Sequence, residues 1–373
     1  MEVERFLADR CRAVEFSGIR KYFGLALRAK DPIDLSIGQP DYDAPDAVKD
    51  AAATAIRAGR NRYTPTDGLP ALREQIRSTL AERHPGWMPV VLIASGVSGG
   101  LVLSLLALLN PGDEVAFADP YFVSYRQLVT MLGGKPIAVP SYPDFSFPTG
   151  AIEQALTPRT RLLLINSPAN PTGRVMPPAE MQAAAELARR RDLLILSDEI
   201  YRDLTFDAGP ASAADFAPER TILLGGFGKT YGVTGWRLGY VAGPAALIHE
   251  MTKMQQYTFV CAPTPFQHAM LTAMRTDVAH HARDYARKRD LVVEGLSDAF
   301  DLVRPGGGFY VFPRAPARFA DASAFCDAAA ERNVFVIPGG IFSSRDTHFR
   351  VSFAAPDDAL RRGCRILCEL AGG

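Results

Sequence analysis

The sequence has no excess of charge of either sign. Among its 373 residues, 41 are Lys or Arg and 41 are Asp or Glu, so the formal net charge is zero. Broad binding of nucleic acid requires a basic surplus. The balance therefore argues against nucleic acid and favours small molecules as partners.

Cysteine is scarce, and its five positions are scattered: Cys11, Cys261, Cys326, Cys364 and Cys368. This usage is unlike the dense disulfide framework of small secreted domains. Cys364 and Cys368 would share one helix face, but no histidine or third cysteine lies nearby to complete a metal site. We interpret all five as reduced thiols, and we expect no metal and a cytoplasmic protein.

Long hydrophobic runs are also absent. The longest, residues 101–109, is interrupted by Ser104 and is far shorter than the ~20 residues of a membrane span. Residues 1–5 are charged, with no apolar region behind them, so we expect no signal peptide. A hydrophobic content of 47% is typical of a soluble protein with an ample core, and the length suggests about two domains.

What the sequence does contain is an alternation of apolar runs and helical patterns. Five runs are apolar almost throughout: residues 90–94, 114–118, 161–165, 193–196 and 221–224. Such runs are typical of strands buried on both faces of a parallel sheet. Helix-like spacing lies between them at residues 99–109, 120–132 and 179–190. The alternation predicts an α/β fold with a mostly parallel sheet flanked by helices.

The two ends of the chain follow another pattern. Residues 16–30 and 272–300 read as amphipathic helices, and short strand-like runs at 308–312, 334–337 and 348–353 alternate with helices. We therefore predict a large domain of residues 41–271, and a smaller α/β domain formed by residues 1–40 and 272–373.

Polar, glycine-rich segments follow four of the central runs. They contain Ser95-Gly96-Val97-Ser98, Asn166 with Asn170, Asp198 with Tyr201, and Lys229 with Arg237. Ligands of open α/β sheets bind beyond the carboxyl ends of the strands. The four segments therefore predict one site at that edge of the sheet.

Lys229 is the most informative of these residues. A lysine at the end of a buried strand is desolvated, so its amine becomes a nucleophile able to form Schiff bases with carbonyl compounds such as pyridoxal phosphate (PLP). Arg237 lies eight residues further on, within a glycine-rich turn, and could hold an anion. A solvated loop with two surface charges would explain this segment equally well on its own.

The segment after the first run suits a phosphate. Gly96, Val97 and Ser98 would stand at a helix start, where free N–H groups and the helix dipole bind anions. An ordinary helix cap by Ser95 or Ser98 is the alternative. The spacing matches neither the dinucleotide fingerprint nor the P-loop, which argues against a nicotinamide dehydrogenase.

Four further residues could contact a planar cofactor. A carboxylate at Asp198 needs a compensating cation, such as a protonated pyridine nitrogen or a structural salt bridge. Tyr201 and the turn residue Asn170 could reach the 3-hydroxyl of the ring, although a packed aromatic and plain turn chemistry explain them as well. Phe122 could stack on the ring or belong to the core.

Two residues lie outside this group. Arg350, in an apolar strand-like run, is either paired structurally or available for a carboxylate. Tyr63 stands on a proline-stiffened loop, and nothing in its surroundings assigns it a role.

Taken in order, the motifs resemble those of the class I/II aminotransferases, the fold-type I PLP enzymes of the aspartate aminotransferase superfamily. The resemblance covers nearly the whole chain and rests on residues 35–41, 63–65, 95–98, 170–173, 197–201, 229–240 and 349–353.

The resemblance implies a role for each site residue. Lys229 would form the internal aldimine with PLP and then act as the base. Asp198 would pair with the pyridine nitrogen, Tyr201 and Asn170 with the 3-oxygen, and Phe122 would stack on the ring. The phosphate would be held by Arg237, Ser98, Val97 and Gly96, and by Tyr63 of the neighbouring subunit in a homodimer. Arg350, with Asn170 and the backbone near Gly38, would bind the substrate carboxylate.

The chain departs from many relatives in ways that affect the expected substrate. Gly226 and Gly228 stand where serines are frequent, and Ser98 stands where some relatives that act on aspartate carry a lysine. Residues 16–19 add no cation beyond the adjacent Arg20 and Lys21. We therefore expect an apolar or aromatic amino donor, with 2-oxoglutarate or pyruvate as acceptor, in a ping-pong reaction.

Two alternatives stay open at this point. A β-elimination (C–S) lyase or related carbanion chemistry would use the same cofactor residues. A non-catalytic effector-binding module is more remote, because Gly38 lies too close to the start for a preceding DNA-binding domain.

Overall fold

The computed structural model describes residues 3–207 and 209–372. Its centre is a seven-stranded sheet with the strand order β2-β8-β7-β6-β5-β3-β4. The strands are β2 (Val90–Ala94), β3 (Glu114–Asp119), β4 (Lys135–Pro140), β5 (Thr160–Asn166), β6 (Leu194–Asp198), β7 (Thr221–Gly226) and β8 (Gly239–Gly243). Only β8 runs antiparallel to its neighbours, so the predicted mostly parallel sheet is confirmed.

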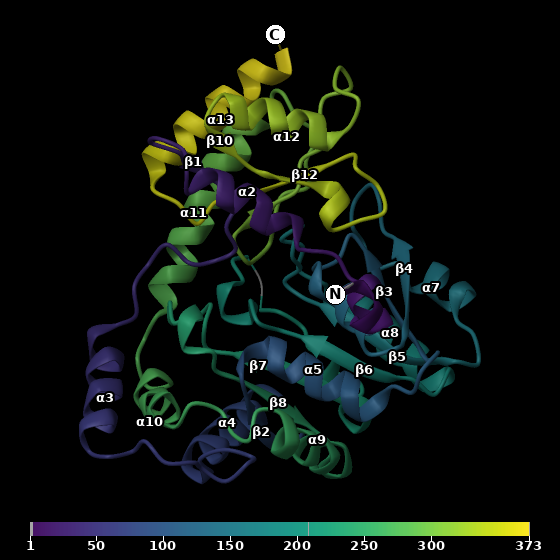
Figure 1. Ribbon diagram of the computed structural model, residues 1–373, viewed down its shortest axis with the longest axis vertical. Coiled ribbons are helices and arrows are strands. Elements are labelled where there is room, and N and C mark those ends of the chain that lie inside the picture. Colours follow the sequence, from purple (N-terminus) through teal and green to yellow (C-terminus); the bar gives the residue numbers. More distant parts are fainter. Residues whose placement is uncertain (1–2, 208, 373) are drawn as a thin grey trace.

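Helices cover both faces of this sheet (Figure 1). One face packs against α5 (Gly96–Leu108), α6 (Ser124–Met131) and α9 (Ala245–Thr258). The other packs against α8 (Pro178–Arg190) and α7 (Thr149–Ala155) at one end, and against α3 (Asp46–Arg57), α4 (Pro70–Arg83) and α10 (Thr264–Ala273) at the other. Successive strand residues pack on opposite faces of the sheet. In β2, Leu92 packs with α5 on one face, whereas Val91 and Ile93 pack with α4 on the other.

The two chain ends share a separate hydrophobic core, which we call the second core. The elements that surround it lie at the top of Figure 1. The helices there are α2 (Gly18–Ala26), α11 (Ala279–Leu296), α12 (Ala322–Glu331) and α13 (Asp357–Gly372). The short strand β1 (Ile33–Asp34) pairs with β10 (Val334–Phe335), and β12 (Phe349–Ser352) lies between β11 (Ile337–Pro338) and β9 (Tyr310–Val311). The exact boundaries at residues 40 and 272 stay a prediction, and Met1, Glu2 and Gly373 lie outside the described residues.

Several element bounds differ from the sequence prediction. In the segment at 272–300 the helix is shorter than predicted, since α11 covers Ala279–Leu296 and residues 272–273 are the end of α10. Helix α6 begins at Ser124 rather than at residue 120, and before it the N–H of Tyr121 donates to the carbonyl of Phe342. No helix in the described part of the chain is long and apolar enough to cross a membrane.

Candidate active site

A cavity of about 540 Å³ lies at the carboxyl ends of the parallel strands. It is lined by residues of the large sheet and by Gly38, Tyr310 and Arg350 from the segments around the second core. The cavity brings together every predicted site residue except Tyr63: Gly38, Gly96, Val97, Ser98, Phe122, Asn170, Asp198, Tyr201, Lys229, Arg237 and Arg350.

Lys229 follows β7, and its ammonium end points into the cavity. Burial is the largest cause that lowers its pKa from 10.5 to about 8, with Arg350 and Arg237 adding to the effect and Asp198 opposing it. Nζ lies 5.6 Å from the ring centre of Phe309 and donates a hydrogen bond to the carbonyl of Gly38. At pH 7 about a tenth of the lysine is therefore the neutral, nucleophilic amine, far more than for a lysine with its ordinary pKa.

Asp198 ends β6 as a fully buried carboxylate. Its Oδ2 accepts a hydrogen bond of 2.7 Å from Tyr125 Oη, and its Oδ1 accepts one of 3.2 Å from the N–H of Ile200. No ion pair within residues 3–207 and 209–372 includes Asp198, so the alternative of a structural salt bridge is not observed. Burial raises its pKa to about 6. A protonated ring nitrogen in the cavity would supply the missing cation.

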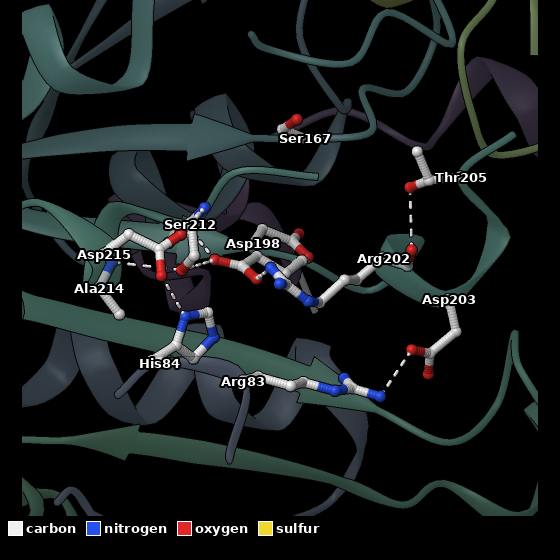
Figure 2. A network of polar contacts seen from close by, with 12 residues as sticks. Arg83, His84, Ser167, Asp198, Arg202, Asp203, Thr205, Ser212, Ala214 and Asp215 are labelled. Atoms are coloured by element: carbon white, nitrogen blue, oxygen red, sulfur yellow. Dashed lines mark hydrogen bonds and ion pairs between the residues drawn. The ribbon is translucent and has the colours of Figure 1, made fainter. Parts of the chain in front are cut away.

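A polar network supports the segment that follows Asp198 (Figure 2). The carboxylate of Glu199 is almost fully buried, and it accepts hydrogen bonds from Ser197, Ser212 and Arg202 at 2.9, 2.5 and 2.8 Å. Asp215 joins this network by accepting from the N–H of Ser212, and it lies 2.6 Å from Nδ1 of the buried His84. The buried charge next to Asp198 is therefore compensated locally, and the backbone from residue 197 to 202 is held in place.

Tyr201 and Asn170 lie where a ring substituent could reach them, but each has a partner here. The hydroxyls of Tyr201 and Tyr310 are 3.1 Å apart. Asn170 Oδ1 accepts a hydrogen bond of 3.0 Å from Arg350 Nη1. Tyr310 and Tyr125 were missed by the sequence analysis, because a tyrosine in an apolar run carries no signal of its own.

Arg350 is fully buried and has no acidic partner within residues 3–207 and 209–372. Its Nη2 donates to the carbonyl of Ser36 at 2.6 Å, and the guanidinium lies 4.5 Å from the ring centre of Tyr310. Its Nε is buried and has no hydrogen-bond partner in the part of the chain that the structure describes. A buried cation in a cavity wall, with no acidic partner among the described residues, fits an incoming carboxylate, which agrees with the role that the resemblance implies.

The first turn of α5 lies beside Arg237. The helix begins at Gly96, three residues earlier than predicted, so the N–H groups of Gly96, Val97 and Ser98 belong to its unpaired start. The side chain of Ser95 makes no capping hydrogen bond. Gly96 has φ +71°, and a Cβ there would lie 2.8 Å from Nη2 of Arg237. The glycine thus leaves space for the guanidinium to lie against the helix start, which is an arrangement suited to a phosphate.

Gly226 fits this chain for steric reasons. A Cβ at this position would lie 2.6 Å from Cδ1 of Ile200 and 3.1 Å from Cγ2 of Val97. A serine at this position would therefore require Ile200 to move. The groups here that could hold an anion are the helix start, Ser98 and Arg237.

Arg20 and Lys21, the two cations that follow Ile19, contact different parts of the molecule. Arg20 lines the cavity, whereas Lys21 pairs with Asp327 at 3.8 Å and lies over the ring of Tyr22. Tyr63 does not line the cavity of its own chain, and 82% of its surface is exposed. Among the described residues, no three His, Cys, Asp or Glu side chains gather as a metal site would require.

Comparison with known proteins gives a consistent result. The family model described as aminotransferase class I and II matches residues 30–367. The chain is 34% identical to a probable aspartate aminotransferase of Methanocaldococcus jannaschii (98% of this chain, 99% of the relative). It is 35% identical to an aromatic-amino-acid aminotransferase of Thermococcus litoralis (97% and 98%).

The fold agrees with this result. The structure of the Thermus thermophilus aspartate aminotransferase with maleate superimposes with a TM-score of 0.93, at 33% identity, over 98% of this chain and 99% of that one. A buried lysine, a buried carboxylate and a buried arginine that share a cavity at the sheet edge complete the agreement. The chain belongs to the class I and II aminotransferases, the family of PLP-dependent transaminases.

Proposed function

We propose that this transaminase binds PLP in the cavity and transfers the amino group of an apolar or aromatic L-amino acid to a 2-oxo acid. The observation that carries the proposal is the cavity itself. A lysine with lowered pKa, and a buried carboxylate and a buried arginine that form no ion pair within the described residues, all line it. The alternatives of a lyase and of an effector-binding module are not favoured, because the similar proteins bear the names of aminotransferases.

The residues present fit the cofactor. Lys229 would hold it through Nζ, Asp198 would pair with the ring nitrogen, and Tyr201 and Asn170 would contact the 3-oxygen. Phe122 would stack on the ring. Gly96, Val97, Ser98 and Arg237 would bind the phosphate.

Bound PLP supplies an electron-withdrawing ring that stabilises negative charge on the substrate α-carbon. The chain's own residues do the rest. Arg350 binds the α-carboxylate and orients the α-hydrogen, while Lys229 Nζ accepts that proton as a base, a role for which a pKa near 8 suits it. Asp198, ionised above about pH 6, stabilises positive charge on the ring nitrogen.

One carboxylate clamp supports a ping-pong order. Among the described residues that line the cavity, Arg350 is the only buried arginine. Donor and acceptor would therefore occupy the same place in turn, with the amino group kept on the enzyme between the two half-reactions.

The cavity wall supports the expected substrates. Ile19, Phe23, Ile37, Leu101 and Val123 line it, and they would pack against an apolar or aromatic donor side chain. Arg20, exposed at the same wall, offers a charge that could pair with the distal carboxylate of 2-oxoglutarate. We therefore favour 2-oxoglutarate over pyruvate as acceptor.

We further propose a cytoplasmic homodimer with shared sites. The exposure of Tyr63 supports this, since a tyrosine that is 82% exposed in one chain is available to contact a phosphate in the other. All five cysteines carry free thiols, as is usual in a reducing compartment.

The direct test is a panel of amino donors added to the PLP-loaded protein without acceptor. We expect phenylalanine, tyrosine or leucine to change the absorbance of the bound cofactor and to release one equivalent of oxo acid per site, with 2-oxoglutarate restoring the spectrum. A clear preference for aspartate would contradict the donor assignment. Continuous release of pyruvate and ammonia from a cysteine conjugate would indicate the lyase.

A further inference from the structure

We propose that Asp41, Tyr42 and Lys288 are positioning residues of the transamination, through which helix α11 fixes the catalytic lysine. The inference rests on the proposed function, because it concerns how Lys229 is placed for the cofactor. Asp41 and Tyr42 belong to the segment Gly38–Tyr42, which we call the lysine clamp, and Lys288 belongs to α11.

The lysine clamp contacts Lys229 at both ends. The carbonyl of Gly38 accepts a hydrogen bond from Nζ, and the hydroxyl of Tyr42 donates one to the main-chain carbonyl of Lys229. The same hydroxyl lies 3.5 Å from the carbonyl of Thr230. A displacement of this segment would therefore move the reactive nitrogen and the backbone that carries it.

One face of α11 holds the lysine clamp. His281, Tyr285 and Lys288 stand at positions i, i+4 and i+7, which share a helix face. Lys288 forms an ion pair with Asp41, and Tyr285 Oη donates to Asp41 Oδ1 at 2.9 Å.

The aromatic ring of Tyr42 is fixed by a stacking contact. Its centre lies 3.5 Å from that of His281, with 4° between the planes. Burial lowers the pKa of His281 to about 4, so this stack does not depend on a charged imidazole at working pH. Burial also raises the pKa of Tyr42, which keeps its hydroxyl a donor.

The lysine of the ion pair is buried, whereas 21% of the Asp41 side chain is exposed. Lys288 is 6% exposed, and its second acidic neighbour, Asp284 on the same helix, lies at 3.2 Å. Gly38, at the other end of the clamp, leaves no spare space, since a Cβ there would lie 2.5 Å from Tyr310 Oη. The clamp is thus fixed between α11 and the wall of the cavity. It connects the second core, to which Tyr285 belongs, with Lys229.

Three variants separate positioning from general stability. Tyr42→Phe keeps the ring that stacks on His281 and removes only the hydroxyl. Lys288→Gln removes the ion pair with Asp41, and Lys288→Arg restores a cation. Arg287→Gln is the matched control, because Arg287 directly precedes Lys288 in α11 but pairs with Asp284 and Asp357 on the surface.

The measurement is the rate at which cofactor-free protein attaches PLP covalently, followed by borohydride quenching and mass spectrometry. We expect Tyr42→Phe and Lys288→Gln to slow attachment and to lower kcat by about 10-fold, since small misplacements of a reacting group have large effects on rate. KM should change less than kcat. Lys288→Arg should recover most of the loss, and Arg287→Gln should stay within about twofold of the wild type, an estimate based on its exposure.

The outcomes are distinct. Wild-type attachment rates in Tyr42→Phe and Lys288→Gln would overturn this inference and leave the proposed function intact. So would losses that Arg287→Gln shares, or losses that simply follow the melting temperature. If the wild type itself attaches no PLP, the proposed function fails and this inference fails with it.

Discussion

At the scale of single residues, burial shifts two groups of the active site toward their uncharged forms. Lys229 becomes more acidic and Asp198 less acidic, in both cases chiefly because the cavity wall removes water. Holding a lysine neutral and a carboxylate without a cation lowers the stability of the cofactor-free protein. Both groups are thereby ready to react with the cofactor or to pair with it.

Asp198→Asn should stabilise the cofactor-free protein in a pH-dependent way. The pKa of Asp198 is raised from 3.8 to about 6, so the folded protein binds more protons than the unfolded chain between these values, and its stability falls as pH rises through them. At about 1.4 kcal/mol per pH unit, the cost above pH 6 is about 3 kcal/mol.

We predict that Asn at this position increases the free energy of unfolding by up to that amount near pH 7.5. The gain should shrink as pH falls toward about 4, while PLP affinity decreases at all pH values. Denaturant unfolding at several pH values checks this. A difference that stays constant with pH would contradict the assignment.

Arg20→Gln should change the choice of acceptor. Arg20 lines the cavity and is exposed, so we predict a rise of up to about fivefold in KM for 2-oxoglutarate, the size expected for a screened ion pair. The KM for pyruvate should not change. Lys21→Gln is the control, since Lys21 pairs with Asp327 instead. Equal effects on both acceptors would exclude recognition of the distal carboxylate by Arg20.

At the scale of elements, the cavity depends on where strands end and helices begin. The buried strands β5, β6 and β7 could be predicted because continuous apolar runs are a strong signal, and Lys229 and Asp198 follow from their ends. Strand β8 could not, because Gly239–Gly243 lies inside a glycine-rich segment, and β4 is an edge strand with only one buried residue, Val139.

Contacts between elements that lie far apart in the chain could not be predicted from the sequence either. The hydrogen bond from Tyr125 to Asp198 and the ion pair of Asp41 with Lys288 each join separate elements of the fold. Arg20 and Lys21 are adjacent cations in the sequence, and only the orientation of α2 separates their surroundings. Such pairings depend on tertiary packing rather than on local pattern.

Gly96→Ala should damage the start of α5. With φ at +71° and a Cβ 2.8 Å from Arg237 Nη2, alanine would cost about 1–2 kcal/mol of backbone strain and displace the guanidinium. We predict a lower melting temperature and weaker PLP binding, measured by thermal unfolding and cofactor titration.

Gly150→Ala is the control for this substitution. Gly150 lies in α7, and a Cβ there meets nothing within 4 Å, so alanine should be neutral or stabilising by up to about 1 kcal/mol. Unchanged PLP binding in Gly96→Ala would argue against a phosphate at the α5 start.

At the scale of the whole molecule, the cavity lies between two hydrophobic cores. The large sheet supplies Lys229 and Asp198, and the segments of the second core supply Tyr310 and Arg350. Shared sites in a homodimer would add Tyr63 from the neighbouring subunit.

Mixing two inactive variants tests the shared site. In a heterodimer of Lys229→Ala and Tyr63→Ala chains, one site combines an intact Lys229 with an intact Tyr63 only if Tyr63 acts across the interface. When the two variants exchange subunits at random, about half of the dimers are heterodimers, and each has one working site out of two. We therefore predict that mixing restores activity toward a quarter of the wild-type value. No recovery despite confirmed exchange would place Tyr63 outside the neighbouring site.

The proposed mechanism depends on Lys229 as the residue that carries the cofactor. Borohydride reduction of the PLP-loaded protein, followed by peptide mapping by mass spectrometry over a range of pH, tests this. We predict one adduct per chain, on the peptide that contains Lys229, absent in Lys229→Ala, with an attachment rate to cofactor-free protein that rises with pH and levels off above about 8. An adduct on another lysine, or equal labelling of Lys229→Ala, would contradict it.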